Sequence, residues 1–205
     1  DALENFISAG CNAIIVCAVD AEAAAPVVAK AKEQGIAVVC LTSQVDGYDA
    51  YIGCEERVLG YTQGCAVGQR IAEMYGTEEE VLAATLNYDL MESVIARKEG
   101  IMEGIKEYAP NVVFVADATA ADQEEGMTNT ENFLQANPDL KVVCGVSDGA
   151  ALGAYQAFKA AGLTDRDKYL IAGIDATDEA LKLISESTIY QVSVSQNPTS
   201  TGKAL

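Results

Sequence analysis

Short apolar runs rich in valine and isoleucine alternate along the chain with longer amphipathic stretches. This alternation is typical of strands that helices cover on both faces of a parallel sheet. Strands are predicted over Ala13–Val19, Ala37–Leu41, Glu80–Leu86, Asn111–Ala116, Lys141–Val146, Tyr169–Ile174 and Tyr190–Ser195. Helices are predicted over Ala21–Gln34, Glu56–Tyr75, Glu92–Tyr108, Thr128–Asn137, Ala150–Ala161 and Thr177–Glu186. The pattern therefore predicts an α/β fold with one or two parallel sheets and right-handed crossovers.

One predicted helix carries glycines at every fourth position, at Gly60, Gly64 and Gly68. This stretch also contains polar residues such as Gln63 and Arg70, which do not suit a membrane helix. The spacing therefore predicts close packing against a second helix. No glycine-rich phosphate-binding motif follows a predicted strand, so the sequence offers no nucleotide site of that kind.

Polar side chains follow most of the predicted strands. Ligands of open parallel sheets bind beyond the carboxyl ends of the strands, so these positions are the candidates for a binding site. Ser147, Asp175 and Gln196 supply hydrogen-bond donors and acceptors for a neutral polar ligand, and we expect them to contact it. Asp20, Asp148 and Thr177 each lie near the start of a predicted helix, and we expect them mainly to cap helices.

Composition removes several classes of function. The formal net charge of −18 argues against nucleic acid as a partner of this segment. Histidine is absent, which removes the commonest general base and the usual imidazole metal ligand. No pairing of the remaining Asp, Glu, Lys and Cys residues suggests a catalytic site. We therefore expect no enzyme activity, no cofactor and no metal.

The six cysteines form no C-x-x-C pair, so the sequence gives no sign of a zinc knuckle or a redox dithiol. Cys17, Cys40 and Cys144 lie in apolar runs, and we expect all three to be buried in strands as small hydrophobic residues. Free cysteines are more usual in a reducing compartment than in an exported protein.

A longer set of motifs resembles the ribose-binding protein family of type I periplasmic binding proteins, whose fold is shared with LacI effector domains. The motifs are GCNAIIVCAVDAEAAAPVVAKAKEQGIAVV, YIGCEERVLGYTQG, ARKEGIMEGI, NPDLKVVCGVSDGAALGAYQAFKAAG, IAGIDATDEALKLI and VSVSQNP, in that order. The resemblance implies two Rossmann-like lobes that close on a ligand by a hinge. It places residues 1–53 with 197–205 in a partial N-terminal lobe and residues 54–196 in a C-terminal lobe. The ligand cleft lies between them, and the family's first strands are expected to precede this chain.

The resemblance also assigns roles to individual residues. Asp175 and Gln196 match positions that contact sugar hydroxyls, and Ser147 stands where the family often has Asn. The pocket departs from the family at other positions: Cys17 replaces Asn, Thr42 and Ser43 replace an Asp-Arg pair, Ile95 lies near the expected Arg, and Ala121 replaces an aromatic residue. We therefore expect a ligand other than ribose, because this pocket lacks the charge-assisted contacts that hold a pentose.

New contacts are expected from the loop after the third predicted strand, where Tyr88, Asp89 and Glu92 lie. The predicted ligand-binding set is Asp175, Gln196, Ser147, Thr42, Ser43, Cys17, Tyr88 and Asp89. The family implies an extracytoplasmic solute-binding protein, periplasmic or a cell-surface lipoprotein, that delivers a sugar or related metabolite to the transmembrane permease subunits of an ABC importer. The alternative is the ligand-sensing effector domain of a LacI-type transcription regulator, which the free cysteines favour.

Overall fold

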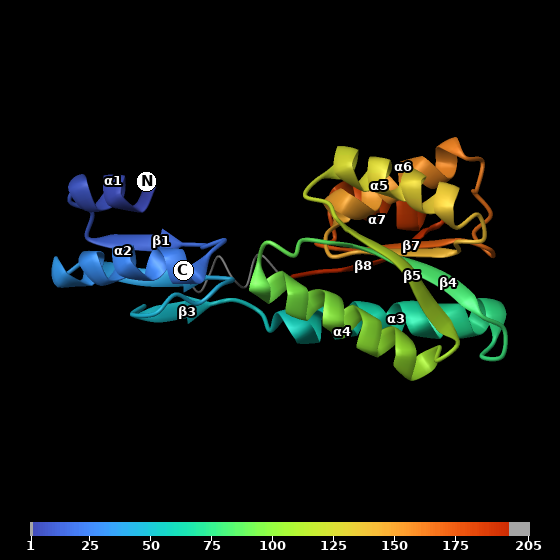
Figure 1. Ribbon diagram of the computed structural model, residues 1–205, viewed down its shortest axis with the longest axis horizontal. Coiled ribbons are helices and arrows are strands. Elements are labelled where there is room, and N and C mark those ends of the chain that lie inside the picture. The colour runs from blue at the N-terminus through green and yellow to red at the C-terminus, as the bar shows by residue number, and fades with distance from the viewer. Residues whose placement is uncertain (1, 197–205) are drawn as a thin grey trace. The chain divides into compact units, whose positions relative to one another are not determined.

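The computed structural model describes residues 2–196, which form two compact units. The first unit contains the described residues up to Cys54, and the second runs from Glu55 to Gln196. Figure 1 shows the elements of both units.

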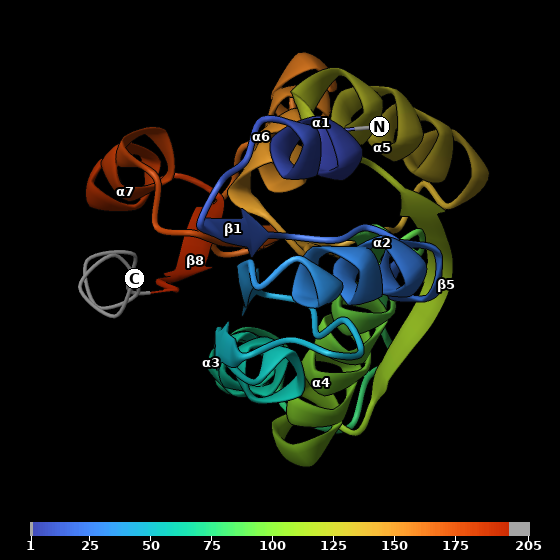
Figure 2. The same ribbon diagram turned by 90° about the vertical axis from the view of Figure 1, so that its left-hand side faces the viewer.

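The first unit is built on a short parallel sheet of order β1-β2-β3. Figure 2 brings this unit, in blue, to the front. Its elements are α1 (Ala2–Ser8), β1 (Ala13–Val16), α2 (Ala21–Glu33), β2 (Ala37–Leu41) and β3 (Ala50–Ile52). Val28 of α2 packs with Ile14 and Val38 of the strands in one apolar core. The Asp20 side chain accepts a hydrogen bond from the Ala23 N–H at 2.8 Å and caps α2, which confirms that prediction.

The second unit contains a five-stranded sheet of order β5-β4-β6-β7-β8, in which all neighbouring strands are parallel. Helices α3 and α4 cover one face of the sheet, and α5, α6 and α7 lie on the other (Figure 1). The elements are α3 (Glu56–Tyr75), β4 (Val81–Asn87), α4 (Glu92–Tyr108), β5 (Val112–Thr119), α5 (Gln123–Ala136), β6 (Val142–Gly145), α6 (Asp148–Ala160), β7 (Leu170–Ile174), α7 (Asp178–Ser185) and β8 (Tyr190–Val194). The predicted α/β fold with parallel sheets flanked by helices is confirmed.

The central strands of this sheet are buried on both faces. Every residue of β6 and β7 is buried, as their continuous apolar sequence predicts. Between the sheet and the helices α5, α6 and α7, one core includes Leu86, Val143, Phe158, Ile171 and Tyr190. This core fixes the strands and therefore the positions of the residues that follow them.

Helices α3 and α4 pack with their backbones in close contact. A Cβ atom built on Gly60 would lie 1.9 Å from the carbonyl oxygen of Arg97, and one built on Gly100 would lie 2.1 Å from that of Arg57. No side chain fits at such distances. The close helix packing that the glycine spacing predicts is therefore confirmed.

Some element boundaries differ from the prediction. Helix α5 begins five residues before the predicted Thr128, because the Asp122 side chain caps it by accepting from the Glu125 N–H at 3.0 Å. Helix α1 and strand β3 were not predicted, since each is too short to show a clear period.

The prediction that three cysteines are buried in strands is wrong for Cys17. Cys40 and Cys144 are fully buried, but Cys17 is exposed. Strand β1 ends at Val16, and its buried positions alternate with exposed ones. Cys17 therefore lies just after the strand, where the apolar sequence continues on the surface. Burial raises the pKa of the Cys144 thiol to about 12.

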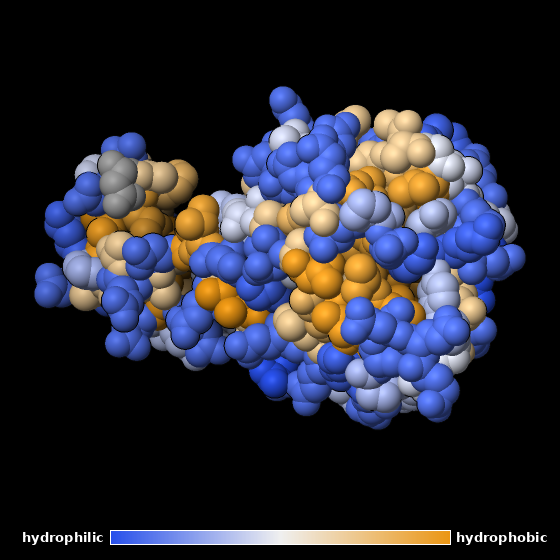
Figure 3. Space-filling model, turned by 45° about the vertical axis from the view of Figure 1, so that its right-hand side comes forward, coloured by the Kyte–Doolittle hydropathy of each residue, from blue (hydrophilic) through white to orange (hydrophobic). Residues whose placement is uncertain are grey.

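Large apolar side chains on the surface of the second unit are scattered over several elements. They are Val58, Leu90, Tyr108, Val113 and Leu181. On the face shown in Figure 3, apolar residues of this unit gather in one area that hydrophilic residues surround. Within residues 2–196, no helix combines the length and the apolar character that crossing a bilayer requires.

Candidate functional site

The carboxyl ends of β6, β7 and β8 meet at one edge of the second unit's sheet, because these strands are parallel neighbours. Ser147, Asp175 and Gln196 follow these three strands and are all partly buried. The register pairs Ile174 with Val194, which brings Asp175 close to the residues that follow β8.

Asp175 and Gln196 are in direct contact. The Gln196 Nε2 donates to Asp175 Oδ1 at 2.5 Å, and the backbone N–H of Asp148 donates to Asp175 Oδ2 at 3.4 Å. A carboxylate offers about four acceptor positions, so Asp175 retains capacity to accept further hydrogen bonds. Gln196 adds an amide that both donates and accepts. Such a pair suits a ligand rich in hydroxyl groups.

The environment of Asp175 disfavours its charged form. Burial raises the pKa of this carboxyl above the ordinary aspartate value, and the negative charge of Asp148 raises it further. The hydrogen bonds from Gln196 and the Asp148 backbone, together with the charge of Arg97, act in the opposite direction. A carboxyl with a raised pKa at a sheet edge is a common property of functional sites.

The backbone at Asp175 is strained. Asp175 has a φ of 127° and Ala176 a φ of 52°, values that residues other than glycine rarely adopt. Strain of this kind clusters at ligand-binding positions and persists only where the surroundings enforce it.

Ser147 and Asp148 have roles that differ from the prediction. Ser147, not Asp148, caps α6, because its Oγ accepts from the Ala150 N–H at 3.3 Å. Asp148 is the first residue of the helix and is fully buried, and its carboxylate accepts from residues of other elements. The capping prediction is therefore wrong for Asp148. It is confirmed for Thr177, whose Oγ1 accepts from the Ala180 N–H at 3.4 Å and caps α7.

A buried ion pair lies close to this edge, and the sequence reasoning missed it. Arg97 Nε donates to Glu56 Oε2 at 2.6 Å, and Arg97 Nη1 donates to the Val146 carbonyl oxygen at 2.6 Å. Arg97 and Glu56 are each only 6% exposed. The signal was present in α4, where Arg97 shares a face with the buried Val94 and Ile101, so an unpaired charge there would be very costly.

The loop after β4 has fewer unengaged polar groups for a ligand than the sequence suggests. The Lys98 Nζ lies 3.1 Å from Asp89 Oδ1 and 3.4 Å from Asp117 Oδ2, so the Asp89 carboxylate is already engaged in an ion pair. Tyr88 is partly buried, and Glu92 is exposed at the first residue of α4. Tyr88 and Asp89 remain predicted ligand contacts.

Two of the positions where the chain departs from the family, Ile95 and Ala121, lie in the second unit, on elements other than those that carry Asp175 and Gln196. Ile95 is partly buried within α4, and Ala121 is exposed just before α5. The Ala121 N–H donates to Glu125 Oε2 at 2.7 Å, so its backbone belongs to the start of that helix.

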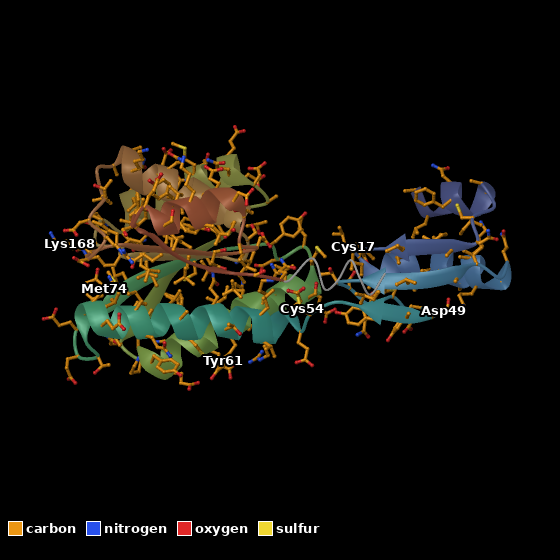
Figure 4. The ribbon with its side chains drawn as sticks, turned by 180° about the vertical axis from the view of Figure 1, so that it is seen from behind. Cys17, Asp49, Cys54, Tyr61, Met74 and Lys168 are labelled. Atoms are coloured by element: carbon orange, nitrogen blue, oxygen red, sulfur yellow. The ribbon has the colours of Figure 1, made fainter. Side chains whose placement is uncertain are left out.

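In the first unit, Cys17, Thr42 and Ser43 follow the ends of β1 and β2. Ser43 Oγ donates to the Ala18 carbonyl oxygen at 2.6 Å and accepts from the Ala18 N–H at 3.0 Å, which ties the two strand ends together. Thr42 has a φ of 69°. Figure 4 labels Cys17 at this end of the sheet and Asp49 at the other, where Asp49 Oδ2 accepts from the Val38 N–H at 2.7 Å.

The family model of the periplasmic binding protein domain matches this chain over residues 1–205. The chain belongs to this family. Within it, the chain is a ribose-binding-like type I periplasmic binding protein, as its motifs predict.

This periplasmic binding protein domain is similar to several named proteins. It is 30% identical over 213 residues to a putative rhizopine-binding protein of Rhizobium meliloti, covering 98% of this chain and 65% of the relative. It is 30% identical over 178 residues to the D-apiose import binding protein of Actinobacillus succinogenes, covering 86% of this chain and 55% of the relative. Across the first relatives, the chain therefore spans less than two thirds of their length.

Solved structures give the same fold. An ABC transporter solute-binding protein from Bacillus halodurans with bound myo-inositol is 32% identical, with a TM-score of 0.84, and the match covers 98% of this chain and 69% of that one. A periplasmic solute-binding protein from Actinobacillus succinogenes with bound D-allose is 26% identical, with a TM-score of 0.82, covering 99% and 71%. These relatives are binding proteins, and the binding protein domain described here has the α/β architecture that they share.

Proposed function

We propose that this chain is the larger part of an extracytoplasmic solute-binding protein of an ABC importer, periplasmic or anchored at the cell surface. Its ligand is a sugar or a sugar-like polyol, bound in a cleft between the two units and retained by hinge closure. The protein delivers this ligand to the transmembrane subunits of a permease and carries out no catalysis.

The observation that carries the proposal is the contact between Asp175 and Gln196 at the carboxyl edge of the sheet. The 2.5 Å hydrogen bond holds the Asp175 carboxylate, and its remaining acceptor positions are available to ligand hydroxyls. Both residues match family positions that contact sugars. The named relatives are import binding proteins and sugar- or inositol-bound structures, which supports the importer over a transcription regulator.

The first unit supports a ligand other than ribose. Ser43 uses its hydroxyl to join Ala18, so it does not restore the charged group that the family has at this position. Cys17 is exposed at the neighbouring strand end and offers only a weak thiol donor. A ligand that needs fewer charge-assisted contacts than a pentose fits these residues better.

The test is a thermal-shift screen of the protein with D-ribose, D-allose, D-apiose and myo-inositol, followed by calorimetric titration of every compound that stabilises it. A true ligand raises the melting temperature with concentration by mass action. Asp175→Ala should abolish the shift. Asp139→Ala is the matched control, because Asp139 is exposed and lies at the opposite edge of the sheet, before β6. An unchanged shift in Asp175→Ala contradicts the assignment of the site.

A further inference from the structure

Asp148 lies next to the candidate site but is 0% exposed. Its Oδ1 accepts from the Tyr190 hydroxyl and from the Ser193 hydroxyl, each at 2.7 Å. Its Oδ2 accepts from the Thr177 N–H at 2.8 Å and from the Thr177 hydroxyl at 2.9 Å. These four bonds fill the acceptor positions of the carboxylate, so Asp148 has none left for a ligand.

The carboxylate sets the direction of the neighbouring hydrogen bonds. A carboxylate only accepts, so the hydroxyls of Ser193 and Thr177 must both point their protons at it. Their oxygens then accept from backbone N–H groups. Ser193 Oγ accepts from the Ala176 N–H at 3.0 Å, and Thr177 Oγ1 accepts from the Ala180 N–H at 3.4 Å.

The Tyr190 hydroxyl donates to the same carboxylate oxygen, Asp148 Oδ1, but none of the hydrogen bonds described above joins Tyr190 to the strained turn at Asp175 and Ala176. Burial raises the pKa of the Tyr190 hydroxyl, and the Asp148 charge raises it further, so this hydroxyl stays protonated and donates. Gly173 makes room for the contact, because a Cβ atom there would lie 2.1 Å from the Tyr190 hydroxyl oxygen and 2.4 Å from Asp148 Oδ1.

The chain of bonds from Asp148 ends at the turn formed by Asp175 and Ala176. Both residues have positive φ values, which the chain does not keep without external support. Ser193 holds the Ala176 N–H, and Asp148 holds Thr177 from the other side and the Asp175 carboxylate through its own N–H.

We propose that Ser193, whose hydroxyl Asp148 orients, is a positioning residue that holds the strained turn and thereby aims the Asp175 carboxylate at the ligand. Neither Asp148 nor Ser193 needs to touch the ligand for this role. The ligand part of this inference rests on the proposed function, whereas the holding of the turn does not.

The test compares Ser193→Ala with Tyr190→Phe in the full chain. Each variant removes one 2.7 Å hydrogen bond to Asp148 Oδ1, but only Ser193 also holds the Ala176 N–H. The first measurement is the exchange rate of the Ala176 amide proton by NMR without ligand. We expect Ser193→Ala to raise this rate about tenfold, the effect of losing one hydrogen bond, and Tyr190→Phe to change it less than about twofold. Ser193→Thr keeps the hydroxyl and should restore slow exchange.

The second measurement is the dissociation constant for myo-inositol, or for D-allose if myo-inositol does not bind. Ser193→Ala should raise it about tenfold, and Tyr190→Phe and Ser193→Thr should leave it within about twofold of the original. Equal Ala176 exchange in Ser193→Ala and Tyr190→Phe overturns the positioning role. If the two variants differ in Ala176 exchange but have equal dissociation constants, the link between the held turn and ligand binding is overturned. If the unmodified protein binds no sugar or polyol of the thermal-shift screen, the proposed ligand class fails while the exchange rates still decide the positioning role.

Discussion

At the scale of single residues, Asp175 combines three properties that the sequence alone does not give. It has an unusual backbone, a direct bond to Gln196 and a carboxyl whose pKa is raised, mainly by burial. The strand-end position identified the residue, but strain and burial depend on its neighbours in space. The ion pair of Arg97 could not be predicted from the sequence for the same reason, because its partner Glu56 lies 41 positions away on another helix.

The raised pKa of Asp175 predicts how binding depends on pH. In the proposed site, ligand hydroxyls donate to the ionised carboxylate, so affinity for any polyol that binds should fall as the pH is lowered through the pKa of Asp175. The loss should begin at a higher pH than for an aspartate of ordinary pKa, about 3.9. Calorimetric titration from pH 7 to pH 4 checks this. Asp175→Asn should bind weakly at every pH, and an equally steep acid loss in that variant contradicts the prediction.

At the scale of elements, long amphipathic helices were predicted with their observed bounds. Glu56–Tyr75 and Glu92–Tyr108 are the bounds of both the predicted and the observed helices, and Gly76 and Pro110 mark their C-terminal ends in the sequence. Helix α5 was predicted too short, because its first turn QEEG is polar and only the Asp122 cap defines the start. Strand β3 has three residues, so its pairing with β2, not its own pattern, makes it a strand.

The close contact between α3 and α4 predicts that the stability of the protein depends strongly on the glycines at this contact. Gly100→Ala should lower the free energy of unfolding by about 3 kcal/mol, because the new methyl group would meet the Arg57 carbonyl oxygen and force the helices apart. Gly149→Ala is the matched control, since it lies in α6 with its nearest neighbour, Ser147 Oγ, 3.7 Å from the added carbon. That variant should raise the free energy of unfolding by about 0.5 kcal/mol. Urea denaturation of both variants measures the difference, and equal stabilities would contradict it.

At the scale of the whole molecule, the second unit is one continuous stretch of chain with its own sheet and core. Its fold class followed from the sequence, because buried parallel strands have a continuous apolar signature. The way in which the two units meet around a ligand is a proposal that the alternation of strands and helices does not address.

The continuity of the second unit predicts that residues 55–196 fold as a separate polypeptide. We expect a single cooperative thermal transition by circular dichroism, because the sheet, both helical layers and the Glu56–Arg97 pair all lie within this stretch. A shorter polypeptide, residues 77–196, is the control. It lacks α3, so it loses Glu56 as the partner of Arg97 and exposes the apolar surface of the sheet and of α4 that α3 covers, and we expect no cooperative transition. A fragment 55–196 without a cooperative transition would show that the unit depends on the rest of the chain.

The neighbouring residues Ser147 and Asp148 differ in how freely they can be changed by directed evolution. Ser147 is partly exposed at the strand end, and its capping bond can be replaced by Asn, Asp or Thr at little cost. Asp148 joins α6, α7 and β8 through four hydrogen bonds, so almost any replacement leaves a buried group unsatisfied. A mutant library intended to give this scaffold a new ligand should therefore vary position 147 and keep position 148 fixed.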